Sequence, residues 1–202
     1  MLISQPFAAG FPSIPLTKKE VRDVAVLMEG TAVNVALLDE YDATKKSVTA
    51  GMKSFGWVHF ACHGMHDNRQ PLVSGLCLQD GCLELLEIME QRIPDADFAF
   101  LSVSESSKGN PNLSEEVVHF TAGMLGAGYR GVVGTMWTIF DKEAPEFATE
   151  FYKYLLRESG PEGLDSTRAA YALDHATRTV RERLGKDDTA LMTWIPYVHF
   201  GY

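Results

Sequence analysis

Two polar segments begin where apolar runs of the sequence end, and both contain residue types that can do chemistry. The run WVHFACHG at residues 57–64 ends on His63 and Gly64, and the run FAFLSV is followed by SESSKG. His63 offers a proton acceptor, and the unhindered amide of Gly64 offers a hydrogen-bond donor beside it. General-base catalysis with stabilisation of an oxyanion requires such a pair of groups. A single histidine at a strand end is more often structural, so a role for His63 depends on a partner.

Ser104, the first residue of SESSKG, is the candidate nucleophile. In serine hydrolases the nucleophile commonly stands on a strained turn flanked by glycines, G-x-S-x-G. Ser104 lies between Val103 and Glu105, and Gly109 is the first glycine that follows it. The sequence therefore lacks this turn, and a loop serine bonded to its own backbone is the alternative interpretation.

Residue types that bind zinc occur together in one part of the sequence: Cys62, His63, His66, Cys77 and Cys82. Structural zinc sites usually contain C-x-x-C pairs, and none is present here. Cys77 and Cys82 instead flank a predicted hairpin turn and are expected to be core thiols. We therefore expect neither a metal site nor a cofactor.

Predicted strands and helices alternate along the chain. Apolar runs of strand length occur at 2–5, 33–39, 57–64, 98–103, 131–137 and 197–202. Helical spacing occurs at about 18–29, 44–55 and 85–92, from Ser114 onward, and at 143–158 and 165–184. Asp80-Gly81 lies between two alternating runs and predicts a small hairpin. The order of elements predicts an α/β fold, with a mostly parallel central sheet and helices on both faces.

Functional residues of such sheets gather beyond the carboxyl ends of the strands. Three segments of this sequence fit that description: His63-Gly64, Ser102 to Ser107, and Trp137 to Asp141. We expect His63 and Ser104 to face each other across one cleft at this edge of the sheet.

Length, charge and cysteine content exclude several classes of protein. A chain of 202 residues fits one domain. Its 18 basic and 27 acidic side chains give a net charge of −9, without a basic stripe, which disfavours a nucleic-acid partner. No run approaches the roughly 18 apolar residues of a membrane span, and the first residues do not form a secretory signal. Three cysteines are too few for a disulfide scaffold, so we expect a reduced, cytoplasmic protein without a membrane partner.

Several motifs, taken in order, resemble the CHAT domain, a family of caspase-fold peptidases related to separase. They are VHFACHG, SGLCLQDGCLELLEI, ADFAFLSVSESSKG and LSEEVVHFTAGMLGAGYRGVVGTMWTIFDKEAPEFATEFYKYLL, which together span about residues 55–156. The resemblance implies a caspase-like α/β/α sandwich, and a single domain over residues 1–202. It also implies that this domain comes from the C-terminal part of a longer protein with upstream regulatory or repeat domains. A protein or peptide would be the substrate.

The resemblance assigns roles to residues at two of the predicted strand ends. The histidine of the family's His-Gly pair is the general base, which corresponds to His63. The family's nucleophilic cysteine follows a strand in a pattern like S-A-C-x-T, and here residues 102–106 read S-V-S-E-S. Ser104 therefore occupies the cysteine position, and the N–H groups of Gly64 and Ser104 would form the oxyanion hole.

The resemblance to separase extends to a W-x-x-x-D segment, which shapes the pocket for the residue before the cleaved bond. Trp137 and Asp141 correspond to this segment. A carboxylate there would pair with an arginine, and the indole would pack along the guanidinium group. The alternative for Asp141 is the N-cap of a helix that starts at Lys142.

Serine at position 104 changes the expected chemistry. A cysteine attacks as a thiolate, whereas a serine must lose its proton during the attack to a closely oriented base. Serine in place of cysteine should raise the activation free energy of the attack by an amount on the order of 4 kcal/mol or more. We therefore expect either a cysteine endopeptidase domain that is inactive or very weak as written, or a natural pseudopeptidase that serves as a protein-interaction module. A true serine hydrolase is a third possibility, and Ser104 is either an engineered replacement or a natural one.

Overall fold

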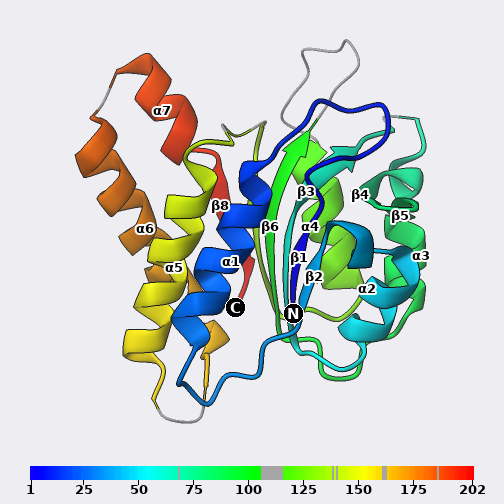
Figure 1. Cartoon of the computed structure of the whole chain (residues 1–202), viewed down its shortest axis with the longest axis horizontal. Helices are drawn as coiled ribbons and strands as arrows, with labels where there is room; N and C mark the ends of the chain where they lie inside the picture. The colour runs from blue at the N-terminus through cyan, green and yellow to red at the C-terminus, as the bar shows by residue number, and fades with distance from the viewer. Residues whose placement is uncertain (68, 106–115, 138, 140, 161–162, 186) are drawn as a thin grey trace.

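The protein is a three-layered sandwich in which one sheet lies between two layers of helices (Figure 1). The computed structural model describes residues 1–67, 69–105, 116–137, 139, 141–160, 163–185 and 187–202. The strands are β1 (Leu2–Ser4), β2 (Leu37–Asp39), β3 (Trp57–Met65), β4 (Gly75–Leu78), β5 (Gly81–Glu84), β6 (Phe98–Glu105), β7 (Gly131–Thr135) and β8 (Tyr197–Gly201). The helices are α1 (Leu16–Met28), α2 (Lys45–Met52), α3 (Leu85–Glu90), α4 (Glu116–Gly126), α5 (Ala144–Glu158), α6 (Ala169–Leu184) and α7 (Asp188–Trp194).

The main sheet has the strand order β2-β1-β3-β6-β7-β8. The first five of these strands are parallel to one another, and β8 runs antiparallel to β7 at the edge. The hairpin of β4 and β5 turns at Gln79 and Asp80 and pairs antiparallel with the end of β3. The predicted fold class, a mostly parallel sheet with helices on both faces and a small hairpin, is confirmed.

Alternation along the strands divides the core into two halves. Phe98 and Phe100 of β6 point toward the layer of α1, α5 and α6, whereas Ala99 and Leu101 point toward α2, α3 and α4. Figure 1 shows these two helical layers on opposite sides of the sheet. Because both faces of the central strands are covered, their sequences are apolar on both sides.

Several boundaries differ from the sequence-based prediction. β6 continues two residues past Val103, so the backbone of Ser104 belongs to the strand and not to an exit loop. β2 is shorter than the predicted strand at 33–39, because β1, with which it pairs, offers three residues for pairing. The predicted helix start at Ser114 lies outside the described residues.

Two helices near the C-terminal half also differ. α5 begins at Ala144 with Glu143 at its N-cap, so the predicted alternative of Asp141 as the N-cap is wrong. α7 was not predicted, and it begins where the side chain of Asp187 accepts a hydrogen bond from the N–H of Ala190 (2.8 Å). Within the described part of the chain, no helix is both long enough and apolar enough to cross a bilayer.

Candidate active site

His63 and Ser104 occupy matching positions on neighbouring parallel strands. His63 is the seventh residue of β3, and its Cα partner in β6 is Ser104. Adjacent strands of a sheet lie about 4.8 Å apart, so the two backbones are side by side at this position. Both positions stand near the carboxyl ends of their strands, at the upper edge of the sheet in Figure 1.

The ring of His63 is held by a segment that precedes α1. The side chain is 2% exposed, and its Nε2 lies 2.7 Å from the carbonyl oxygen of Pro12. A carbonyl only accepts hydrogen bonds, so Nε2 carries the proton and donates it, and the lone pair of the neutral ring lies on Nδ1. Phe11 stacks on the ring at 5.0 Å between centroids. Phe11 and Pro12 therefore fix both the tautomer and the plane of the imidazole.

Beneath His63, a buried carboxylate ties α1 to both strands. Glu20 is 1% exposed, and its Oε1 lies 2.9 Å from Nε2 of His59 on β3. Its Oε2 accepts a hydrogen bond from the hydroxyl of Ser102 on β6 (3.1 Å). His59 precedes His63 by four residues, and Ser102 precedes Ser104 by two. Glu20 therefore connects the strand segments directly below the two candidate positions.

Asp141 lies at the start of α1. Its Oδ2 accepts a hydrogen bond from the N–H of Leu16, the first residue of that helix (3.2 Å). Partial burial raises the pKa of Asp141, and the nearby carboxyl of Glu20 raises it further. The hydrogen bond from Leu16 and the electrostatic influence of His63 act in the opposite direction. Asp141 is therefore close enough to His63 to interact with it electrostatically, while it also caps α1.

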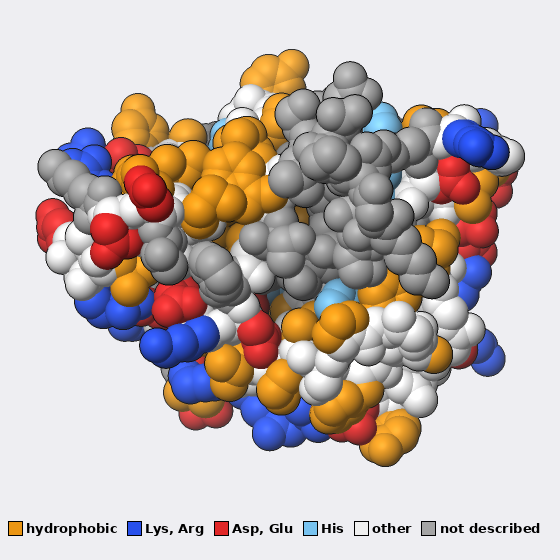
Figure 2. All heavy atoms as spheres, turned by 90° about the horizontal axis from the view of Figure 1, so that it is seen from above, with side chains coloured by type: hydrophobic (Ala, Val, Ile, Leu, Met, Phe, Trp, Pro, Cys, Tyr) orange, Lys and Arg blue, Asp and Glu red, His pale blue; other side chains and the backbone are white. Residues whose placement is uncertain are grey.

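Trp137 contacts a different element. Its indole Nε1 donates a hydrogen bond to the carbonyl of Met192 in α7 (3.2 Å). Trp137 therefore bonds to α7, whereas Asp141 bonds to α1. Residues 138 and 140 between them are outside the described chain. Viewed from above, the face at these strand ends carries a group of hydrophobic side chains, with many charged ones toward the periphery (Figure 2).

Gly64 packs against the half of the core that faces α2, α3 and α4. It pairs with Leu76 in β4 and with Glu105 in β6. A Cβ atom at this position would lie 2.8 Å from Val103 Cγ1 and 3.1 Å from the ring of Phe120. Only glycine therefore fits next to His63 without a shift of these neighbours.

The sequence-based analysis named His63, Gly64, Ser104, Trp137 and Asp141 as candidates, but it missed the residues that contact and support His63. Glu20 lies within a helix of mixed polarity, where a glutamate is normally solvated. Phe11 and Pro12 lie in a loop, and an aromatic residue before a proline was the only available signal. Among the side chains that the structure describes, no three His, Cys, Asp or Glu residues converge as metal ligands would.

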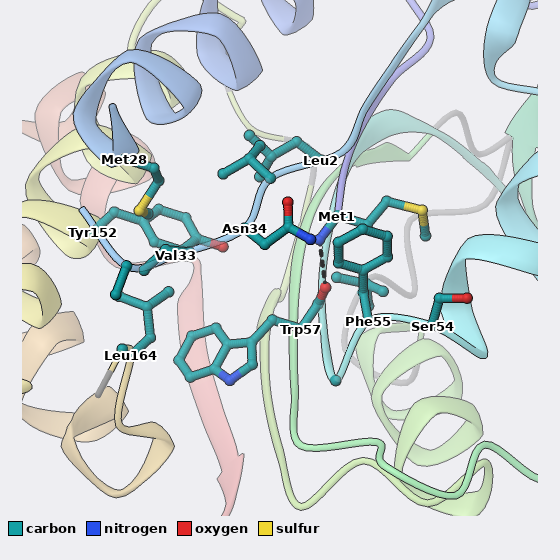
Figure 3. Close-up of a pocket in the computed structure, with 15 residues that line it drawn as sticks. Met1, Leu2, Met28, Val33, Asn34, Ser54, Phe55, Trp57, Tyr152 and Leu164 are labelled. Carbon is teal, nitrogen blue, oxygen red and sulfur yellow. Dashed lines mark hydrogen bonds between the residues drawn. The ribbon is translucent and has the colours of Figure 1, made fainter. Parts of the chain in front are cut away.

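A separate cavity of about 330 Å³ lies at the opposite ends of the strands. Met1, Val33, Phe55, Trp57, Tyr152 and Leu164 contribute to its lining (Figure 3). There the backbone nitrogen of Met1 donates a hydrogen bond to the carbonyl of Trp57 (2.7 Å). Trp57 begins β3 and His63 lies near its end, so this cavity is not part of the candidate active site.

The structure of this chain is similar to that of a known protein. Among solved structures, the chain is similar to the Arg specific cysteine proteinase gingipain R, with a TM-score of 0.59 and 13% sequence identity. The match covers 99% of this chain but 45% of the gingipain chain, so this chain spans less than half of that protein's structure. At this identity the likeness concerns the fold, which is caspase-like.

Sequence comparisons give one family. No curated protein sequence matches the chain. The CHAT domain family matches residues 3–202, which is nearly the whole chain. The chain therefore belongs to the CHAT domain family, and its fold is caspase-like.

Proposed function

We propose that this chain is an endopeptidase domain that acts through His63 and position 104 and is nearly inactive because serine stands at the nucleophile position. The observation that carries the proposal is the register of β3 and β6, which pairs a buried, oriented histidine with Ser104. Strand periodicity assigns position 104 to the same face of β6 as Ser102.

The hydrogen bond to Pro12 defines what His63 would do. With the Nε2 proton engaged by the carbonyl, Nδ1 is the nitrogen that would accept a proton from the group at position 104. A thiol there would ionise before it attacks, and the imidazolium would stabilise the thiolate. A hydroxyl must transfer its proton during the attack. The activation free energy with serine is therefore higher than with cysteine, by an amount on the order of 4 kcal/mol or more. The amides of Gly64 and Ser104 are the donors we assign to the oxyanion.

We extend the proposal to a basic residue before the cleaved bond. Burial makes the ionised form of Asp141 unfavourable, and an arriving guanidinium would offset that desolvation. The Arg specificity named for gingipain R is consistent with this assignment. Trp137 would pack against the same substrate side chain.

The test is Ser104→Cys, assayed on peptides that differ only in the residue before the cleaved bond. We expect measurable cleavage of Arg peptides, and loss of that cleavage when His63→Ala is added. Asp141→Asn in the same background keeps an acceptor for Leu16 and should reduce the preference for Arg. A folded Ser104→Cys protein that cleaves no peptide of a broad panel would contradict the proposal.

The residues around the nucleophile position favour a second function, in which the domain recognises protein without cleaving it. Val103 departs from the family pattern together with Ser104. A module of this kind would bind a peptide or the regulatory or repeat domains upstream of it. It predicts peptide binding without hydrolysis even in Ser104→Cys. Labelling of Ser104 by a fluorophosphonate would instead indicate a serine hydrolase.

A further inference from the structure

Two cysteines face each other across the β4–β5 hairpin. Cys77 and Cys82 are direct partners in the register, and their Sγ atoms lie 2.8 Å apart. The N–H of Leu85 donates to the carbonyl of Ser74, and hydrogen-bonded pairs alternate along an antiparallel ladder. The Cys77–Cys82 pair is therefore a non-hydrogen-bonded pair, in which Cα atoms are about 4.5 Å apart. That separation lies within the range of roughly 4.4–6.8 Å found for disulfides.

The two thiols differ in exposure and acidity. Cys82 is half-buried, whereas Cys77 is 2% exposed. The hydrogen bond with Cys77 lowers the pKa of the Cys82 thiol, Lys45 assists electrostatically, and the pKa of Cys77 is raised in return. Cys62 is fully buried in β3, and burial raises the pKa of its thiol. Cys82 is thus the accessible thiol that ionises first, and Cys77 lies in contact with it.

We propose that Cys77 and Cys82 form a reversible disulfide by exchange with a small disulfide such as oxidised glutathione. The Cys82 thiolate attacks one sulfur of glutathione disulfide, forming a mixed disulfide and releasing one glutathione thiolate. The Cys77 thiol then loses its proton and attacks the Cys82 sulfur, which releases the second glutathione. The protein loses two protons and two electrons, and glutathione disulfide gains them as it becomes two glutathione molecules.

The position of the pair indicates a switchable bond and not a structural one. The two cysteines are five positions apart in sequence, so the bond closes a short loop and constrains the unfolded chain little. Because Cys82 is partly accessible, a small thiol can reach its sulfur and reduce the bond again. Cys77 is also the register partner of His63 in β3. The proposed disulfide would therefore form next to the strand that carries the candidate base.

The experiment exposes the whole chain to a series of ratios of oxidised to reduced glutathione, and then unfolds it in denaturant that contains N-ethylmaleimide, so that all free thiols are trapped. Cleavage at Asp80 afterwards separates Cys77 from Cys82 in the sequence. We expect two of the three thiols to become protected at high ratios, with Cys62 still alkylated. The peptides on either side of the Asp80 cleavage should stay joined until dithiothreitol separates them.

Two variants provide matched controls. Cys62→Ala should keep the linkage and its dependence on the glutathione ratio, whereas Cys82→Ala should abolish it. Three alkylated thiols across the whole series, a linkage that contains Cys62, or a glutathione adduct on Cys82 that is not displaced would each overturn the proposal. All of these outcomes are read by mass, and none depends on peptidase activity.

Discussion

His63 and Pro12 are joined by a hydrogen bond of 2.7 Å although 51 positions separate them in the sequence. In the proposed mechanism, the carbonyl would be the group that orients the imidazole base. Phe11 also contacts His63, because its ring stacks on the face of the imidazole. The segment between β1 and α1 therefore holds the side chain of His63 at the end of β3.

Removal of the Phe11 ring should allow the ring of His63, the proposed base, to take more orientations. We expect Phe11→Ala in the Ser104→Cys background to lower the rate of peptide cleavage about five- to tenfold, because stacked aromatic contacts contribute about 1 kcal/mol. Phe7→Ala is the control, since Phe7 belongs to the same segment but is 54% exposed. Equal losses of rate in the two variants would argue against an orienting role of Phe11.

Removal of His59 should destabilise the fold strongly. His59→Ala leaves the Glu20 carboxyl buried without its ring partner, and loss of one member of a buried pair costs about 3–5 kcal/mol. Lys19→Ala removes one member of an exposed pair, Lys19–Asp23, and should cost no more than about 1 kcal/mol. Urea denaturation measures both free energies of unfolding. Similar values for the two variants would mean that Glu20 reaches solvent.

Gly64→Ala should overpack the core beside the candidate base. The added methyl group would meet Val103 and Phe120, and such overpacking costs about 1–3 kcal/mol. Gly160→Ala is the control, because nothing lies within 4 Å of a Cβ atom there. A double-mutant cycle with Val103→Ala should give a coupling that partly rescues Gly64→Ala. Additive effects in that cycle would disprove the steric explanation.

Acid should weaken the fold through His199 in β8. Burial lowers the pKa of His199 below its ordinary value of 6.5. Protonation then favours the unfolded state, so stability is full above pH 6.5 and falls as the pH drops through the folded-state pKa. We expect His199→Gln to flatten the decline in unfolding free energy between about pH 7.5 and 5.5. An unchanged slope in this variant would assign the pH dependence to other groups.

The sequence predicted the elements that local patterns specify. Alternating apolar runs located the central strands, and Asp80-Gly81 located the hairpin, because strand periodicity and turn chemistry act over a few residues. The rule that functional residues gather at strand ends predicted that His63 and Ser104 lie at one edge of the sheet. The structure adds that their strands are direct neighbours.

The contacts that orient and support the site could not be predicted in the same way. Glu20 and Ser102 are 82 positions apart, and nothing in the helical pattern around Glu20 distinguishes it from a solvated residue. The alternative prediction for Asp141 was a cap of the helix that follows it, whereas it bonds Leu16 at the start of a helix 125 positions earlier. Such contacts depend on how layers pack, which a single sequence does not specify.

The two outer strands of the main sheet are both short. β2 has three residues and β8 has five, so each leaves few unpaired N–H and C=O groups along its open side. Short edge strands are poor templates for the addition of a strand from another chain. The domain is therefore protected against growth into extended intermolecular sheets, even though its central strands are among the most apolar segments of the chain.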